Sequence, residues 1–458
     1  MKRISFVCLC AAALVFCRQE RAKPIEAGIE GKTDQNKSAV KPVKEPSEGE
    51  GRADKVDTPL AQKKTTLEIP SVGSSFCKPS QENKGKKPVE LAHIRFQKGQ
   101  FEEAIECSRY ALEKDWGSVP AMHIEGASNA ALGRWAEAKD SFAGALALDP
   151  NDPETLAAVS EFYVNMLRPK KKRYTTMGLE YANRGFNFFR IKERGDERLL
   201  DRLELLIAEA QNDLGFPHLA LEKAKNVSLR RPDWPSAIHE LAMSSFGMSE
   251  IKSAKEQFDR VLELDPLHAY ASHYLAVLKQ RAGESNEAKE LFAKAASLDP
   301  EVFHQPHLIE KSEFEKEVKR ALDELPKDHQ EQLTWVSVEI ADFPSTDDLL
   351  SNSPPLSPTI LGLFRGEALP VDWSKQKRLS RRATTGEHGK DASKKLKANE
   401  RTIFFYRYNL CRVSKSRSEL NDHVRRTLVH EWGHLNGLTE PDLHRIEADE
   451  KGPQHNHE

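Results

Sequence analysis

The sequence has 458 residues, which is enough for two or three domains. Charged residues make up 31% of the chain but the net charge is only −2, so no global field favours nucleic acid as a partner. The low aromatic content of 7% and the long polar segments exclude a protein with many membrane-spanning helices.

Residues 1–17 are organised like an export signal. Two basic residues precede the apolar run 4–16, which is too short to span a bilayer. The run ends in Leu14-Val15-Phe16-Cys17, which resembles the bacterial lipobox, although that pattern usually has a smaller residue before its cysteine. The resemblance implies that Cys17 is lipidated and becomes the N-terminus. A cleaved signal without a lipid, and an uncleaved anchor, remain open.

Residues 18–88 are rich in Lys, Glu, Pro, Ser and Gly and have almost no apolar periodicity. Such a segment does not bury enough apolar surface to offset the entropy lost on ordering, so we expect a disordered tether. Together with Cys17, it predicts an exported protein of the cell envelope, anchored to a membrane on its periplasmic or outer side.

Three cysteines lie beyond the lipobox, at positions 77, 107 and 411, and none forms a CxxC pair. A disulfide framework is therefore not expected, although export permits one bridge. Cys107 falls on an apolar helical position, where we interpret it as a small core residue.

Residues 89–302 repeat with a period of 34 residues. Prolines that end successive units are 34 residues apart, and small residues keep the same phase at Ala104, Ala138, Ala182, Ala220, Ala254 and Ala288, with an insertion in the unit of Ala182. The insertion contains the basic run 170–173, which we interpret as a solvated loop rather than a polyanion site.

The segments 133–139 and 283–289 carry a glycine turn followed by Ala and Lys at matching positions. They resemble the turn and second helix of the tetratricopeptide repeat, and about six repeats are present. The resemblance implies helix pairs stacked into an α-solenoid with a concave surface that binds a protein or peptide partner. A spacer without a docking role remains open.

Residues 303–325 are expected to form a connecting helix. Over residues 326–450 the helical repeat pattern stops and strand-forming residues become frequent. Strand-forming residues gather in three runs, 333–340, 360–366 and 401–408, and the charged stretch 374–400 between the last two is expected to be a mobile insertion. A helix follows that Ser418 is able to cap and Gly437 to end, with an apolar stripe of Leu420, Val424, Leu428 and Leu435.

That helix contains the pattern HExxH at His430, Glu431 and His434. Residues four apart lie on one helix face, so both imidazoles are able to bind the same ion, and Glu431 is within reach of its water. This arrangement is typical of a zinc-dependent hydrolase.

The third ligand needs a separate argument because only 24 residues follow His434. Glu440 lies six residues after His434 and beyond a glycine, the place of the third ligand in metzincins, and a His₂-carboxylate set suits catalytic zinc. His444 and Asp442 remain open as alternatives. His455 and His457, in the tail 451–458, are not expected to bind metal.

These three runs and the helix resemble the zincin-like metallopeptidases called minimal zincins, over residues 326–450. This resemblance implies a compact α+β domain with the metal helix packed on a small sheet. Together with the repeats it predicts a mainly α protein: a tetratricopeptide-repeat α-solenoid followed by a small α+β domain. It also implies an HExxH zinc peptidase, in which Zn²⁺ is held by His430, His434 and Glu440. The substrate would be a peptide or protein.

In this mechanism Glu431 acts as the general base on the metal-activated water. Tyr406 and His423 are open as helpers that stabilise the oxyanion. The alternative is an envelope scaffold for protein–protein interaction whose zincin-like domain is not catalytic.

Overall fold

The computed structural model describes residues 77, 85–167, 170–192, 196–369, 401–443 and 445. The expected signal with Cys17, nearly all of the tether, the charged stretch 374–400 and the tail 451–458 lie outside the described residues. The described chain is mainly helical and ends in a small α+β domain, so the predicted fold class is confirmed.

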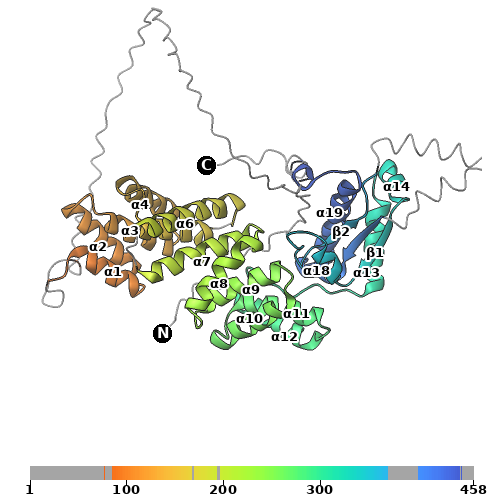
Figure 1. Ribbon diagram of the computed structural model, residues 1–458, viewed down its shortest axis with the longest axis horizontal. Helices are drawn as coiled ribbons and strands as arrows, with labels where there is room; N and C mark the ends of the chain where they lie inside the picture. The colour runs from red at the N-terminus through yellow and green to blue at the C-terminus, as the bar shows by residue number, and fades with distance from the viewer. Residues whose placement is uncertain are drawn as a thin grey trace, which may run out of the picture. The chain divides into compact units, whose positions relative to one another are not determined.

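Six consecutive helix pairs fill the repeat region (Figure 1). The pairs are α1 (Pro88–Gln97) with α2 (Phe101–Lys114), α3 (Val119–Ala131) with α4 (Trp135–Leu148), α5 (Pro153–Glu161) with α6 (Lys172–Lys192), α7 (Glu197–Asp213) with α8 (Pro217–Arg230), α9 (Pro235–Gly247) with α10 (Ile251–Leu264), and α11 (Ala269–Arg281) with α12 (Ser285–Leu298). The small residues that set the period, Ala104, Ala138, Ala182, Ala220, Ala254 and Ala288, are all buried where the helices of a pair approach.

The turn inside each regular pair requires a left-handed residue. Gly133 and Gly283 take positive φ there, with values of 76° and 84°. Ser249 occupies the same repeat position with a φ of 59°, so this turn forms without a glycine.

The irregular repeat contains the inserted residues. Helix α5 runs on into a π-helical turn, η1 (Phe162–Met166), and the basic run 170–173 follows at the start of α6. Our interpretation of that run as a solvated loop is wrong at Lys170, because its side chain is buried in an ion pair with Asp213 of α7. The other three basic residues of the run are exposed.

A disulfide joins Cys77 to Cys107 of α2. Cys107 is a fully buried core residue, as its helical position predicted, and it is also cross-linked, which its position alone did not indicate. The bond ties the segment before α1 to the first helix pair. Cys411 is buried and has no disulfide.

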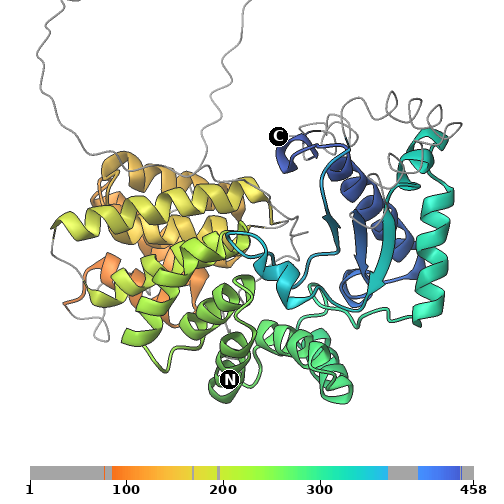
Figure 2. The ribbon, with the colours of Figure 1, turned by 45° about the vertical axis from the view of Figure 1, so that its right-hand side comes forward.

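The C-terminal domain combines helices with a three-stranded sheet (Figure 2). Its elements are α13 (Lys311–Asp323), α14 (Lys327–Leu333), β1 (Ser337–Ala341), α15 (Thr346–Leu350), β2 (Gly362–Arg365), β3 (Thr402–Tyr406), α18 (Arg407–Val413) and α19 (Arg417–Leu435). The strand order is β1-β3-β2, in which β3 pairs with β1 in parallel and with β2 antiparallel. None of the helices in the described ranges is long and apolar enough to cross a bilayer.

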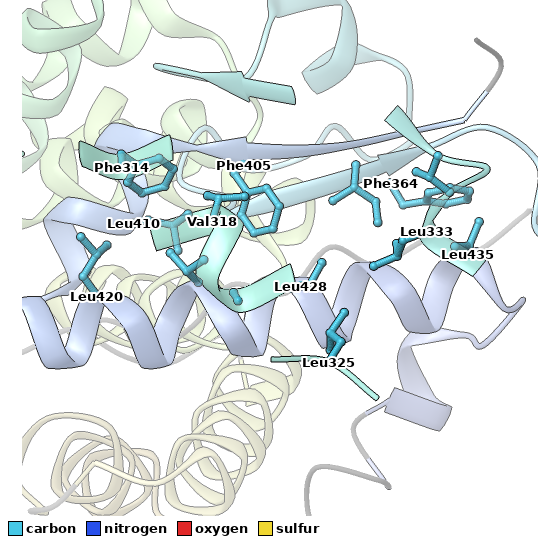
Figure 3. Close-up of a cluster of buried hydrophobic side chains, with 14 of the residues drawn as sticks. Phe314, Val318, Leu325, Leu333, Phe364, Phe405, Leu410, Leu420, Leu428 and Leu435 are labelled. Carbon is cyan, nitrogen blue, oxygen red and sulfur yellow. The ribbon is translucent and has the colours of Figure 1, made fainter. Parts of the chain in front are cut away.

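The central strand β3 is buried on both faces because its alternating side chains enter two different cores. Ile403 and Phe405 pack with α13 and the apolar stripe of α19. Phe404 and Tyr406 pack on the opposite face with Leu349 of α15. Figure 3 shows the first of these cores, with the leucines of α19 directed toward the sheet.

Two details differ from the expectations. The first strand begins at Ser337 because Leu333 ends α14, and β3 ends at Tyr406 because α18 begins at Arg407. Helix α19 is capped by Ser416 rather than Ser418: the Ser416 hydroxyl accepts a hydrogen bond from the Glu419 N–H at 3.2 Å. The predicted stripe of Leu420, Val424, Leu428 and Leu435 is fully buried and anchors the helix.

Candidate metal centre

Helix α19 carries His430, Glu431 and His434 at the end that lies beside β2. Its leucine stripe packs on the sheet, and this packing fixes the rotation of the helix about its own axis. His430 and Glu431 are consequently buried, at 4% exposed each, one turn before the helix ends. The hydrophobic core therefore places the HExxH pattern inside the domain and not on its surface.

The end of α19 is a Schellman turn built around Gly437. The Leu438 N–H donates to the Gly433 carbonyl, and the Gly437 N–H to the His434 carbonyl. Gly437 takes a φ of 80°, which turns the chain back toward the histidines. The residues after this turn bring Glu440 to the same side as His430 and His434.

The donor atoms of His430, His434 and Glu440 converge. His434 Nε2 lies 3.2 Å from His430 Nε2 and 3.2 Å from Glu440 Oε1, and His430 Nε2 lies 3.6 Å from the same oxygen. Ligand atoms about 2.1 Å from a tetrahedral ion are ~3.4 Å apart, so these separations fit one zinc ion. The Glu440 carboxylate is buried, and among the described residues both of its oxygens lack a hydrogen-bond donor apart from these imidazoles.

The charges of the site favour a bound cation. Burial alone would lower the pKa of His434, but its contact with Glu440 and the charge of Glu431 raise that pKa above its ordinary value. Burial would conversely raise the pKa of Glu440, but the two imidazoles outweigh it and lower that pKa. Both shifts mean that the site stabilises a positive charge next to the Glu440 carboxylate.

A backbone carbonyl orients one of the histidines. His434 Nδ1 lies 3.0 Å from the Leu438 carbonyl oxygen, which accepts a hydrogen bond only if Nδ1 carries the proton. Nε2 then presents its lone pair toward Glu440. This is the support that metal-binding histidines usually have from a second layer of groups.

The Glu431 carboxylate contacts β2 and also interacts electrostatically with His430 and His434. Its Oε2 accepts a hydrogen bond from the Phe364 N–H at 2.7 Å, and burial raises its pKa despite the two neighbouring histidines. Burial disfavours the charged carboxylate and so makes Glu431 a stronger base than an exposed glutamate, which suits a group that accepts a proton.

The alternative third ligands are placed differently. Asp442 bonds to the backbone and hydroxyl of Thr439 and to Arg445, so its carboxylate is already engaged away from the histidines. His444 lies outside the described residues. Of the proposed oxyanion helpers, His423 lies 3.0 Å from the Ser414 hydroxyl, and Tyr406 is buried in the core on the other face of β3.

Sequence reasoning missed the groups of β2 and the Leu438 carbonyl. The Phe364 N–H and the Leu438 carbonyl are backbone groups, which every residue type provides, so no side-chain pattern marks them. Gly362 gave a weak signal, since a glycine inside a strand often marks the close approach of another segment.

Comparison with known families supports the resemblance of the C-terminal domain to zincin-like metallopeptidases. Residues 382–450 match the family model described as zincin-like metallopeptidase, and this stretch contains α19 and Glu440. The predicted resemblance to zincin-like metallopeptidases is therefore confirmed over this part of the chain. No curated protein sequence matches the chain.

The repeat region is similar in fold to solved tetratricopeptide-repeat proteins. YrrB, described as a TPR protein with an unusual peptide-binding site, is 18% identical over 43% of this chain and 94% of its own, with a TM-score of 0.33. PilW, described as a type IV pilus biogenesis factor, is 18% identical over 47% and 93%, with a TM-score of 0.39. PilF of Pseudomonas aeruginosa is 17% identical over 47% and 91%, with a TM-score of 0.39.

Proposed function

We propose that the C-terminal domain is a zinc-dependent peptidase and that the repeats bring it a protein or peptide. The convergence of His430, His434 and Glu440 on one point, with donor separations that suit zinc, is the observation that carries this proposal. The family match over residues 382–450 supports peptide bonds as the substrate class.

Zinc bound by these three residues would supply Lewis acidity toward a peptide carbonyl and would acidify water. The protein's own part begins with Glu431. Because its Oε2 is committed to the Phe364 N–H, the other carboxylate oxygen, Oε1, is the atom that takes the proton of the attacking water. The same carboxyl then gives the proton to the departing amine, which leaves Glu431 ionised for the next turnover.

The cellular setting is part of the proposal. We infer export and attachment to a membrane through a lipid on Cys17. The disulfide between Cys77 and Cys107 supports export, because such bonds persist mainly in oxidising compartments. Replacing Cys17 with serine should abolish the incorporation of labelled fatty acid into the protein; unchanged labelling would contradict the lipid anchor.

Metal content is the first test, and it uses the full chain. The wild type should bind about one zinc ion per chain, and His430→Ala should bind none. A folded wild type that binds no zinc when the ion is supplied would refute the peptidase proposal and leave the repeat solenoid as the working part of the protein.

Catalysis is tested separately with a peptide library and Glu431→Gln. This variant should keep its zinc but lose activity by about 10²- to 10⁴-fold, the contribution typical of a general base. If Glu431→Gln cleaves peptides as well as the wild type, the assigned role of Glu431 is wrong. If neither chain cleaves any peptide, a scaffold with a non-catalytic domain becomes the better account.

A further inference from the structure

Glu431 belongs to the helix, but the strand β2 holds its carboxylate. The Leu361 carbonyl accepts a hydrogen bond from the Tyr406 N–H, so the backbone groups of Leu361 face β3. The backbone groups of successive residues in an antiparallel strand face opposite sides, so those of Phe364, three residues later, face away from β3. The Phe364 N–H that donates to Glu431 therefore lies on the edge of the described sheet. The carboxylate therefore occupies the place that the carbonyl of another strand would take.

Gly362 lies beside this contact and leaves no room for a side chain. A Cβ built there would lie 3.0 Å from Glu431 Oε1, 2.5 Å from Thr427 Cγ2 and 3.0 Å from the Phe404 carbonyl oxygen. Its φ is not in the left-handed region, so backbone strain does not explain the glycine. The close approach of β2 to α19 does.

Thr427 and Glu431 are four residues apart on α19, so both side chains face Gly362 from one side of the helix. Their effects on residue 362 are separable. Thr427 limits how closely the strand packs on the helix, whereas Glu431 brings the carboxylate to the strand. Once the threonine methyl is removed, two close neighbours of a Cβ at residue 362 remain, the Glu431 carboxylate and the Phe404 carbonyl oxygen, each at 3.0 Å.

We propose that Gly362 and the Phe364 N–H together form a seat that positions Glu431 for proton transfer. Both would act through Glu431 and are therefore positioning groups and not catalytic residues. The inference rests on the proposed function, because it assigns to β2 the task of aiming the carboxylate of that same site.

The kinetic test compares Gly362→Ala, Thr427→Ser and the double variant in the full chain. Thr427→Ser removes the nearest obstacle and serves as the matched control, with unchanged turnover. The double variant should fold and keep its zinc and its KM for a library peptide, while kcat falls about 10²-fold, as expected for a displaced catalytic group. Recovery of wild-type kcat in the double variant would show that Gly362 is needed only for packing.

A second readout does not depend on activity. In chains labelled with ¹⁵N-phenylalanine, the Phe364 amide resonance is identified by its loss in Phe364→Leu. It should move in Glu431→Gln and in the double variant but not in Thr427→Ser. An amide that stays in place in both would overturn the seat. A wild type that binds zinc but cleaves no peptide would refute the proposed function, and this resonance would still decide whether the seat exists.

Discussion

Glu440 is the residue on which the assignment of the metal centre depends most. It is the buried carboxylate among the donors, and its pKa is lowered by the two imidazoles even without metal. Asp442, two residues further along, is also a carboxylate but is engaged by Thr439 and Arg445. Substitutions of Glu440 and Asp442 can therefore be compared to distinguish a metal ligand from a nearby acid that binds no metal.

Glu440→Gln should weaken zinc binding by more than the 10- to 100-fold typical of losing a group behind the ligands, because it removes a charged ligand. Asp442→Asn should leave zinc affinity within that smaller range. Competition with a chelator measures both. Equal zinc affinities in Glu440→Gln and the wild type would contradict Glu440 as the third ligand and leave His444 and Asp442 as the candidates.

At the residue scale, the sequence predicted the side chains of the site but not the backbone groups that hold them. His430, Glu431, His434 and Glu440 were readable because a helical spacing and a glycine turn relate residues that are close in the chain. The contact of Glu431 with Phe364 crosses 67 residues and uses an N–H group. A pattern of residue types does not encode such a contact, because it depends on how β2 docks on α19.

At the scale of elements, α19 is the part whose beginning and end both matter to the site. The sequence contains two serines near its start, and the prediction chose the wrong one. Ser416 accepts the hydrogen bond of the cap, whereas Ser418 is an exposed residue of the first turn. Only the backbone conformation of Ser416, which is extended, distinguishes the two positions.

Ser416→Ala should lower the free energy of unfolding of the domain by about 1 kcal/mol, the usual cost of losing a helix cap. Ser418→Ala is the matched control and should change it by less than about 0.5 kcal/mol, as surface substitutions usually do. Urea unfolding followed by circular dichroism measures both. A larger loss in Ser418→Ala than in Ser416→Ala would contradict the cap.

The elements themselves were predicted well where periodicity is long. The helix pairs follow from a period of 34 residues with buried alanines, and α19 follows from its leucine stripe. Strand ends were displaced by a few residues because Leu333 and Tyr408 suit both a strand and the helix that contains them. The burial of Lys170 depended on the partner Asp213, which no local pattern of charge reveals.

At the scale of the whole molecule, the repeat region contains histidines that folding keeps neutral. Burial lowers the pKa of His273 to about 3, with the nearby charge of Arg412 acting in the same direction. The ring of His273 stacks on that of Phe303, with 4.6 Å between the ring centroids, and its Nδ1 has no hydrogen-bond partner among the described residues. His123 behaves similarly, and burial lowers its pKa to about 4.

Acid should therefore destabilise the repeats. The unfolded chain takes up a proton at His273 below a pH of about 6.5, but the folded chain does not until a pH of about 3, so stability falls as pH falls across this window. At pH 5 this single group should cost about 2 kcal/mol. His273→Phe should reduce the loss of stability between pH 7.5 and 5.

Urea midpoints at the two pH values measure this effect. If His273→Phe loses as much stability as the wild type between the two pH values, the protonation of His273 is not what destabilises the repeats.

The donors of the candidate metal centre all lie between His430 and Glu440, within eleven consecutive residues. Closing so short a loop costs little chain entropy, and the loop contains its own helical turn and glycine reversal. The three donors therefore come from one local stretch of chain, and none of them comes from the repeat region. Zinc binding at this site would draw no ligand from the solenoid, so damage to a repeat would leave the ligand set intact.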